Sequence, residues 1–345
     1  MRYIRTSLLI LTALMLTYCS KSNGGSTGTP IVTPTNLTLS SRVDPANNGN
    51  VTFTASATNA ATYDYDFGNG IFETAASGVV TYRYPEGGTY NVTVVAKSKS
   101  GKTISKSVSV TVTVSLSLIF SDEFDTPGAP NAAKWVYDLG TGDSGWGNNE
   151  LQYYTNRTDN VVVADGVLKI TAKKESFSGS AYTSARLLSR GKFEFTYGTV
   201  EVKAKLPTGV GTWPAIWMLG SNFATVSWPA CGEIDIMEHV GSQQNKIHAT
   251  LHHPGHSGGN GDTKTTTIPT ASTEFHVYKA EWTAAFIKFY VDDTLFYNFP
   301  NNGSIPFNHD FFLILNVAMG GNFGGPVAAG FTSSSMEIDY VRVYQ

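Results

Sequence analysis

The chain has 345 residues, which is long enough for two domains, the larger with a substantial hydrophobic core. Its formal net charge is only -3, which argues against a nucleic-acid partner and favours a neutral one. The two cysteines lie far apart in unlike contexts, which argues against a disulfide framework and a cysteine-based metal site.

The N-terminal segment has the pattern of an export signal followed by a tether. Arg2 and Arg5 precede the apolar run LLILTALML, which is too short to span a bilayer, and LTYC ends at Cys19. This resembles a bacterial lipoprotein signal. We therefore expect removal of residues 1–18, lipidation of Cys19 and a flexible tether over 19–30. The protein would then be exported and lipid-anchored to a bacterial membrane, at the outer membrane or cell surface; an ordinary signal peptide cleaved nearby is the alternative.

Residues 31–114 are predicted to form a separate small domain. The segments YDYDFGNG and YRYPEGGTYNVTVVAKSKSG resemble a polycystic-kidney-disease (PKD) repeat, which implies an immunoglobulin-like β-sandwich. Its aromatic residues alternate as in strands, so we expect them to fill a core rather than stack on carbohydrate. They are Tyr63, Tyr65, Phe67, Tyr82 and Tyr84. We interpret this domain as a spacer.

Residues 117–345 are predicted to be all-β. The clearest strand is TVEVKAKL, where Val200, Val202, Ala204 and Leu206 share one face and charged residues share the other. GVLKITA, IKFYVDDTLFY with a turn at its two aspartates, and MEIDYVRVY have similar patterns. Many short strands favour a sandwich over a parallel α/β sheet.

Three carboxylates stand among apolar residues in WPACGEIDIMEHVG: Glu233, Asp235 and Glu238. In a strand, Glu233 and Asp235 share a face because they are two residues apart. Strict alternation would turn Glu238 to the opposite face, so we predict a β-bulge after Ile236 that returns it to the side of the other two acids. A helix is less suitable, because it would separate positions 233 and 238 by about 140°.

Two glutamates on one face of a strand could form the pair of carboxyl groups that a retaining glycosidase uses. That reaction needs a carboxylate nucleophile and a protonated acid about 5–5.5 Å apart. Asp235, between them, would help to separate their pKa values. The alternative is that the acids form the solvated face of an ordinary amphipathic strand.

The segment GEIDIMEHVG matches the signature of glycoside hydrolase family 16. The segments that flank it resemble those of the laminarinase-like members of this family. These are FSDEFD, GWGNNELQYYT, YTSARL, GTWPAIWML, IHATLHH and YVRVY. The resemblance covers nearly all of 117–345 and implies a concanavalin-like β-jelly-roll with substrate across the concave sheet.

The resemblance implies Glu233 as nucleophile, Asp235 as its assisting acid and Glu238 as general acid/base. The extra residue Met237 is typical of the β-1,3-glucanase, agarase and carrageenase branches. We therefore expect a retaining endo-β-1,3-glucanase acting on laminarin and on mixed-linkage glucan, without a catalytic cofactor. Alternatives are an enzyme that prefers mixed-linkage glucan, an agarase-like enzyme, a transglycosylase, and a non-catalytic glycan-binding lipoprotein.

Six residues are candidate sugar contacts. Trp213 and Trp217 share a strand face and present indole planes for stacking. The complete set is Asn149, Arg186, Trp213, Trp217, Trp228 and His252. Glu150 is expected either to orient Arg186 or to contact sugar, whereas each tryptophan could instead fill the core.

The resemblance also implies a structural calcium ion. Its ligands would be backbone oxygens of Glu123 and Gly166 and the carboxylate of Asp339, and oxygen ligands suit calcium. Asp339 as a plain surface acid is the alternative. We expect the protein to be a monomer that binds β-glucan polysaccharide and oligosaccharides, with the membrane as its other partner.

Overall fold

The computed structural model describes residues 31–345, so the expected signal, the tether and Cys19 lie outside the described residues. The chain divides into two compact units, the larger of which contains Val112–Gln345. Among residues 31–345, we find no helix with the length and apolar character needed to cross a membrane.

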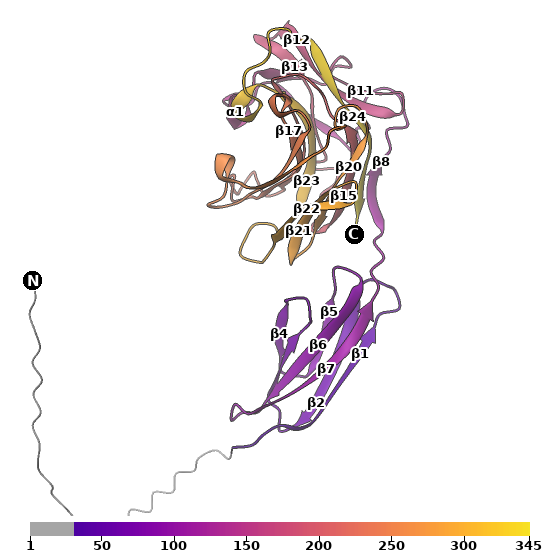
Figure 1. Cartoon of the computed structure of the whole chain (residues 1–345), viewed down its shortest axis with the longest axis vertical. Coiled ribbons are helices and arrows are strands. Elements are labelled where there is room, and N and C mark those ends of the chain that lie inside the picture. The colour runs from indigo at the N-terminus through magenta and orange to yellow at the C-terminus, as the bar shows by residue number, and fades with distance from the viewer. Residues whose placement is uncertain (1–30) are drawn as a thin grey trace, which may run out of the picture. The chain divides into compact units, whose positions relative to one another are not determined.

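The smaller unit contains most of the first seven strands, in a three-stranded sheet (β1-β2-β5) and a four-stranded sheet (β4-β3-β6-β7) (Figure 1). The strands are β1 (Thr35–Val43), β2 (Asn50–Thr58), β3 (Thr62–Asp66), β4 (Phe72–Ala75), β5 (Val79–Arg83), β6 (Gly88–Lys97) and β7 (Thr103–Val112). Tyr63, Tyr65, Phe67 and Tyr84 are buried, and Tyr82 stacks on Phe67 with ring centroids 4.0 Å apart. The prediction that these aromatic residues fill a core is confirmed.

The larger unit contains a ten-stranded sheet in the order β10-β13-β12-β24-β15-β20-β21-β22, with β11 beside β12 and β8 beside β24. Its strands are β8 (Leu118–Asp122), β10 (Gln152–Tyr154), β11 (Val161–Ala164), β12 (Val167–Phe177), β13 (Ser180–Ser184), β15 (Gly198–Lys205), β20 (His276–Trp282), β21 (Phe286–Val291), β22 (Thr294–Pro300) and β24 (Ser333–Tyr344).

A seven-stranded sheet faces it in the order β19-β18-β17-β16-β23-β14-β9. Its strands are β9 (Val136–Asp138), β14 (Arg186–Leu188), β16 (Thr212–Gly220), β17 (Glu233–His239), β18 (Lys246–His252), β19 (Asp262–Thr267) and β23 (Phe311–Met319). The described residues include four short helical segments: η1 (Gly145–Asn149), η2 (Gly241–Gln243), η3 (Gly258–Asn260) and α1 (Gly321–Gly324).

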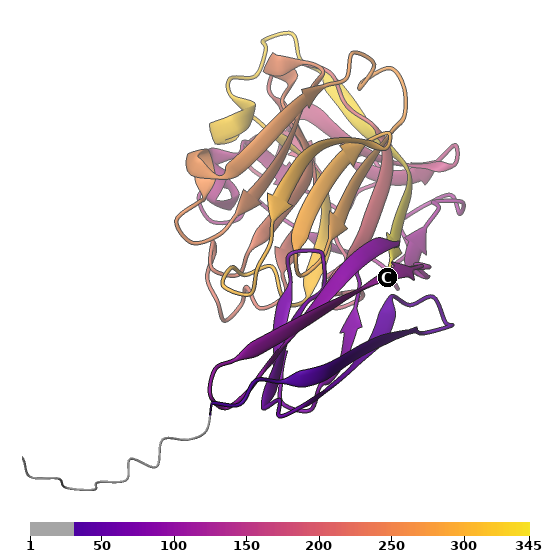
Figure 2. The ribbon, with the colours of Figure 1, turned by 60° about the horizontal axis from the view of Figure 1, so that its bottom comes forward.

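The strands of the larger unit are layered as two sheets (Figure 2), and apolar side chains from both sheets form one core. In β15 the predicted alternation is confirmed, since Val200, Val202 and Ala204 are fully buried and their neighbours face outward. Lys203 and Lys205, on the outward face, form ion pairs with acids of β24. The strand is therefore fixed by apolar burial on one side and by ion pairs on the other.

The predicted hairpin at residues 287–297 also forms. Asp292 and Asp293 adopt left-handed φ angles of 47° and 63° between β21 and β22, as a tight hairpin turn requires. The expectation of an all-β, two-sheet jelly-roll is confirmed for the larger unit.

Candidate active site

A β-bulge in β17 brings the three acids to one face. On one side Asp235 pairs with Trp217 and Met237 pairs with the adjacent Ile216, so the intervening Ile236 is the extra residue. The register with β18 shifts at the same place, between Asp235 and Glu238. Ile236 and Met237 are both buried in the core, so the predicted bulge is confirmed.

Neighbouring strands set functional side chains in rows across this face. In one row, Asp138 of β9 is opposite Arg186 of β14, which is opposite Asn316 of β23. The row continues through Ala215 to Glu238 and then to His248. A second row joins Leu219, Glu233 and His252. Sheet register, rather than proximity in sequence, therefore assembles the site.

Glu233 lies between an indole and an imidazole. Nε1 of Trp228 donates a hydrogen bond to its Oε2 at 2.9 Å, and Nε2 of His252 lies 3.6 Å from its Oε1. The same His252 nitrogen is 3.2 Å from Oδ2 of Asp235. His252, predicted to contact sugar, therefore contacts two of the acids, and Trp228 remains 46% exposed.

Glu238 has two different donors. Nε1 of Trp213 donates to its Oε1 at 3.0 Å, and Oγ1 of Thr250 donates to its Oε2 at 3.3 Å. Phe323 packs edge-on against Trp213 and against the buried His248. Each glutamate thus has its own indole N–H, one from β16 and one from the segment preceding β17.

Burial raises the pKa values of all three carboxyls, and repulsion from a neighbouring acid adds to the rise for Glu233 and Asp235. For Glu233 and Asp235 the pKa lies well above the ordinary value, mainly because they are buried and also because a neighbouring acid is close. Burial also raises the pKa of Glu238, and the hydrogen bond from Trp213 partly offsets this. A hydrogen bond with Glu233 lowers the pKa of Asp235. Burial and the closeness of the acids therefore favour keeping a proton on the cluster.

Arg186 is held by Trp217 and by two residues that the sequence did not point to, Asp138 and Trp146. Its Nε lies 3.2 Å from Oδ2 of Asp138, and its guanidinium carbon lies 4.8 Å from the ring centroids of both Trp146 and Trp217. Trp217 also donates to Oδ1 of Asn316 at 2.8 Å. The aromatic faces and the aspartate fix the orientation of Arg186.

Asn149 and Glu150 lie at the end of η1. Nδ2 of Asn149 donates to Oδ1 of Asn322 at 2.9 Å. Glu150 accepts hydrogen bonds from Gln152 and Tyr154, and burial raises its pKa although the charge of Arg186 opposes this. Arg186 has its direct ion pair with Asp138 rather than with Glu150.

Burial shifts the pKa values of two further residues near β17. His239 is buried and accepts a hydrogen bond from the backbone N–H of Asn245 at 3.1 Å; burial lowers its pKa to about 4. Cys231 is a buried free thiol, and burial raises its pKa to about 11.

The residues predicted to bind calcium come together where β24 changes partner. Asp122 pairs with Val341 on one side and Leu168 pairs with Ile338 on the other, which sets Glu123 and Gly166 close to Asp339. The carboxylate of Asp339 lies 2.7 Å from Nζ of Lys203. Arg342 donates two hydrogen bonds to the carboxylate of Glu123, and these bonds lower the pKa of Glu123. Two backbone carbonyls and a carboxylate are oxygen ligands of the type that calcium prefers. Asp339 would have to break its ion pair with Lys203 to act as one of these ligands.

Comparison with known proteins agrees with this geometry. The profile of "Glycosyl hydrolases family 16" matches residues 148–342, and that of "Beta-glucan synthesis-associated protein SKN1/KRE6/Sbg1" matches residues 51–233. The second match ends at Glu233, so the first alone includes all three acids.

Individual relatives cover the larger unit. The chain is 46% identical over 244 residues to a beta-glucanase of Rhodothermus marinus, covering 66% of this chain and 85% of the relative. The structure of the laminarinase from Rhodothermus marinus superposes with a TM-score of 0.64 at 47% identity, covering 67% of this chain and 98% of the other.

A complex with oligosaccharide is also similar. LamA from Zobellia galactanivorans, in complex with laminaritriose and laminaritetraose, gives a TM-score of 0.61 at 46% identity, covering 66% of this chain and 98% of the other. The bulged strand with its three acids, the two-sheet fold and these matches together show that the chain belongs to glycosyl hydrolases family 16.

Proposed function

We propose that this protein is an endo-acting β-1,3-glucanase that cleaves glucans such as laminarin with retention of configuration. The observation that carries the proposal is the bulge at Ile236, which aligns Glu233, Asp235 and Glu238 on one face. The similarity to a beta-glucanase and to laminarinase structures supports the β-1,3 specificity.

In the proposed first step, Glu233 attacks the anomeric carbon while Glu238 gives its proton to the leaving glycosidic oxygen. A covalent glycosyl-enzyme forms, and Glu238 then removes a proton from the water that hydrolyses it. Asp235 holds a proton shared with Glu233, which limits the number of charges on the cluster and leaves Glu233 free to ionise. The indole donors favour the ionised form of each glutamate without titrating themselves.

The surrounding aromatic and polar groups supply the substrate contacts in this proposal. Trp228 is the exposed stacking surface next to Glu233, and Trp213 and Trp217 offer partly exposed rings on the same face. Arg186 and Asn149 are proposed to donate hydrogen bonds to sugar hydroxyls. His252 is proposed to reach sugar from its position between Glu233 and Asp235.

The test is product sizing and reducing-sugar release from laminarin, mixed-linkage glucan and agarose, with the wild type beside Glu233→Gln. Rapid formation of short oligosaccharides from laminarin, abolished in the variant, is expected. Release of reducing sugar from only mixed-linkage glucan or only agarose would show that the enzyme is specific for that polymer instead. Binding without release would instead favour the glycan-capture alternative, and product analysis at high acceptor concentration would identify a transglycosylase.

We also propose that a structural calcium ion binds the backbone oxygens of Glu123 and Gly166 and the carboxylate of Asp339. The ion would join β8, β12 and β24 and has no part in the chemistry. Chelation should lower the melting temperature and calcium should restore it, whereas Asp339→Asn should melt at the same temperature with and without chelator. An unchanged melting temperature in the wild type would refute the site.

The remaining proposals concern the domains of the chain, its oligomeric state and its export. We propose that 31–114 form a PKD-like, immunoglobulin-fold spacer, that 117–345 form the catalytic domain and that the protein is a monomer. We further propose export with lipidation at Cys19. Radiolabelled palmitate should enter the wild type but not Cys19→Ser, and equal labelling would refute the anchor.

A further inference from the structure

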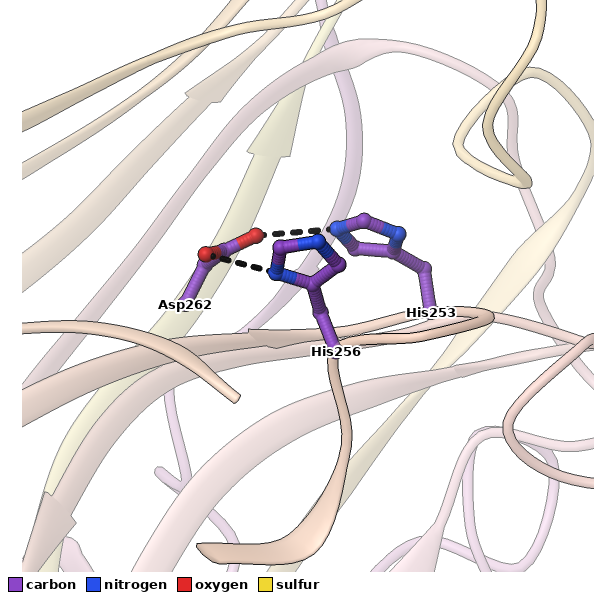
Figure 3. Close-up of side chains that lie close together, drawn as sticks. All are labelled: His253, His256 and Asp262. Atoms are coloured by element: carbon purple, nitrogen blue, oxygen red, sulfur yellow. Dashed lines mark hydrogen bonds and ion pairs between the residues drawn. The ribbon is translucent and has the colours of Figure 1, made fainter. Parts of the chain in front are cut away.

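A second cluster of potential ligands begins directly after His252 in the chain and lies outside the proposed catalytic machinery. His253, His256 and Asp262 each offer one ligand atom, and these atoms all lie within 4.8 Å of one another. Figure 3 shows the two imidazole rings side by side, with both directed at the Asp262 carboxylate. His253 and His256 lie in the connection between β18 and β19, and Asp262 is the first residue of β19. We propose that they bind a divalent transition-metal ion of the zinc class.

The chain geometry preorganises the two imidazoles. His253 and His256 exchange backbone hydrogen bonds of 2.8 and 2.9 Å around Pro254 and Gly255. Gly255 has a φ of +85°, which suits the third position of a tight turn that follows proline. The turn stacks the two rings with centroids 4.7 Å apart and planes 17° apart. Two ligands are therefore already held in place before a metal ion arrives.

The distances suit a small metal ion. Nε2 of His253 lies 2.9 Å from Oδ2 of Asp262, and Nδ1 of His256 lies 3.0 Å from Oδ1. Ligands about 2.0–2.2 Å from a tetrahedral ion are about 3.3–3.6 Å from each other. Each nitrogen and its oxygen partner therefore need to separate by about 0.3–0.7 Å. The imidazole protons that now form hydrogen bonds would move to the other ring nitrogens.

The types of ligand atom and their surroundings indicate which metal ions the site would bind. Two imidazoles and one carboxylate favour zinc, cobalt, nickel or copper over calcium and magnesium, which prefer oxygen ligands. His253 is buried and packs against Phe299 and Phe307, whereas the side chain of His256 is 49% exposed. The exposed side leaves a fourth position for water. Such a site would fix the loop whose Gly261 packs directly on the ring of His252.

The experiment titrates metal-free, tag-free full-length protein with Co²⁺ and Zn²⁺. Calorimetry and the visible absorption of bound Co²⁺ should report one site per chain, and the melting temperature should rise with Zn²⁺. His256→Gln and Asp262→Asn each remove one of three protein ligands and should weaken binding by about a hundredfold or more. Asp292→Asn is the matched control, because it removes the carboxylate of another His–Asp pair, with His276, and should bind as the wild type does.

The second group with metal-binding potential comprises Glu233, Asp235 and His252, and the same titration separates it from the proposed site. Glu233→Gln should retain the cobalt spectrum and the affinity of the wild type. The proposal is overturned if the wild type binds neither ion, if His256→Gln binds as tightly as the wild type, or if only Glu233→Gln loses binding.

Discussion

Trp213→Phe tests whether the indole N–H of β16 sets the pH range in which Glu238 acts as an acid. That N–H donates to Oε1 of Glu238 at 3.0 Å, and Glu238 is only 8% exposed. The hydrogen bond lowers the pKa of Glu238, so its loss should raise that pKa. A hydrogen bond to a charged group contributes about 1.5–3 kcal/mol. The lower value applies because Thr250 still donates to the other oxygen.

About 1.5 kcal/mol changes a protonation equilibrium by roughly a factor of ten. The alkaline limb of kcat/KM on laminarin should therefore move upward by about one pH unit in Trp213→Phe. The acid limb, which reports the ionisation of Glu233, should stay in place. Both limbs come from initial rates measured over a broad pH range at substrate concentrations well below KM.

Trp217→Phe is the matched control. It removes the same indole N–H from the same strand face, but its Nε1 donates to Asn316 rather than to an acid. Either variant is expected to change KM, because both rings are proposed to stack on sugar, yet only Trp213→Phe should move the alkaline limb. An unmoved limb in Trp213→Phe, or equal movement in both variants, would refute the reasoning.

Three further changes probe the same strand. Asp235→Asn removes the acid that competes with Glu233 for the shared proton and whose charge, when the proton is on Glu233, raises the pKa of Glu233, so the acid limb of kcat/KM should move to lower pH; a move to higher pH would contradict the electrostatic argument. Glu238→Ala should lower laminarin hydrolysis by about 10²–10⁴-fold, whereas rate measurements with a dinitrophenyl laminari-oligosaccharide, whose leaving group needs no proton, should show a much smaller loss. Met237→Ala opens a cavity under the bulge and should lower the free energy of unfolding in urea by about 2–5 kcal/mol, and Met237→Leu by less than about 1.5 kcal/mol.

Local periodicity made much of the larger unit predictable. The alternation in β15, the paired aspartates between β21 and β22 and the bulge in β17 each depend on residues adjacent in sequence. For the bulge, apolar residues at both 236 and 237 required two consecutive inward side chains, while Glu238 had to face its partners.

The partners of the site residues depend on sheet register, which the sequence does not reveal. Asp138 meets Arg186 only because β9 pairs with β14, and Asn316 joins them through β23. Trp146 reaches Arg186 from η1, where it has a left-handed φ of 57° that no periodicity predicts. The one available signal was the Arg186 charge itself, which requires a nearby acid when it is largely buried.

In the proposed mechanism, the two indole donors explain how one strand can hold two glutamates in different roles. Tryptophan donates but cannot accept a proton, so Trp213 and Trp228 stabilise carboxylates without competing for the proton that the reaction transfers. A tyrosine or histidine in either place would add a second titrating group beside the acid. His252 is the one imidazole within ion-pair distance of these acids in the described residues, and it contacts Glu233 and Asp235 directly. Burial raises the pKa of Glu238, the proposed proton donor, whereas Trp213, the nearby His252 and Thr250 lower it, so comparing Trp213→Phe with the wild type isolates the contribution of one hydrogen bond.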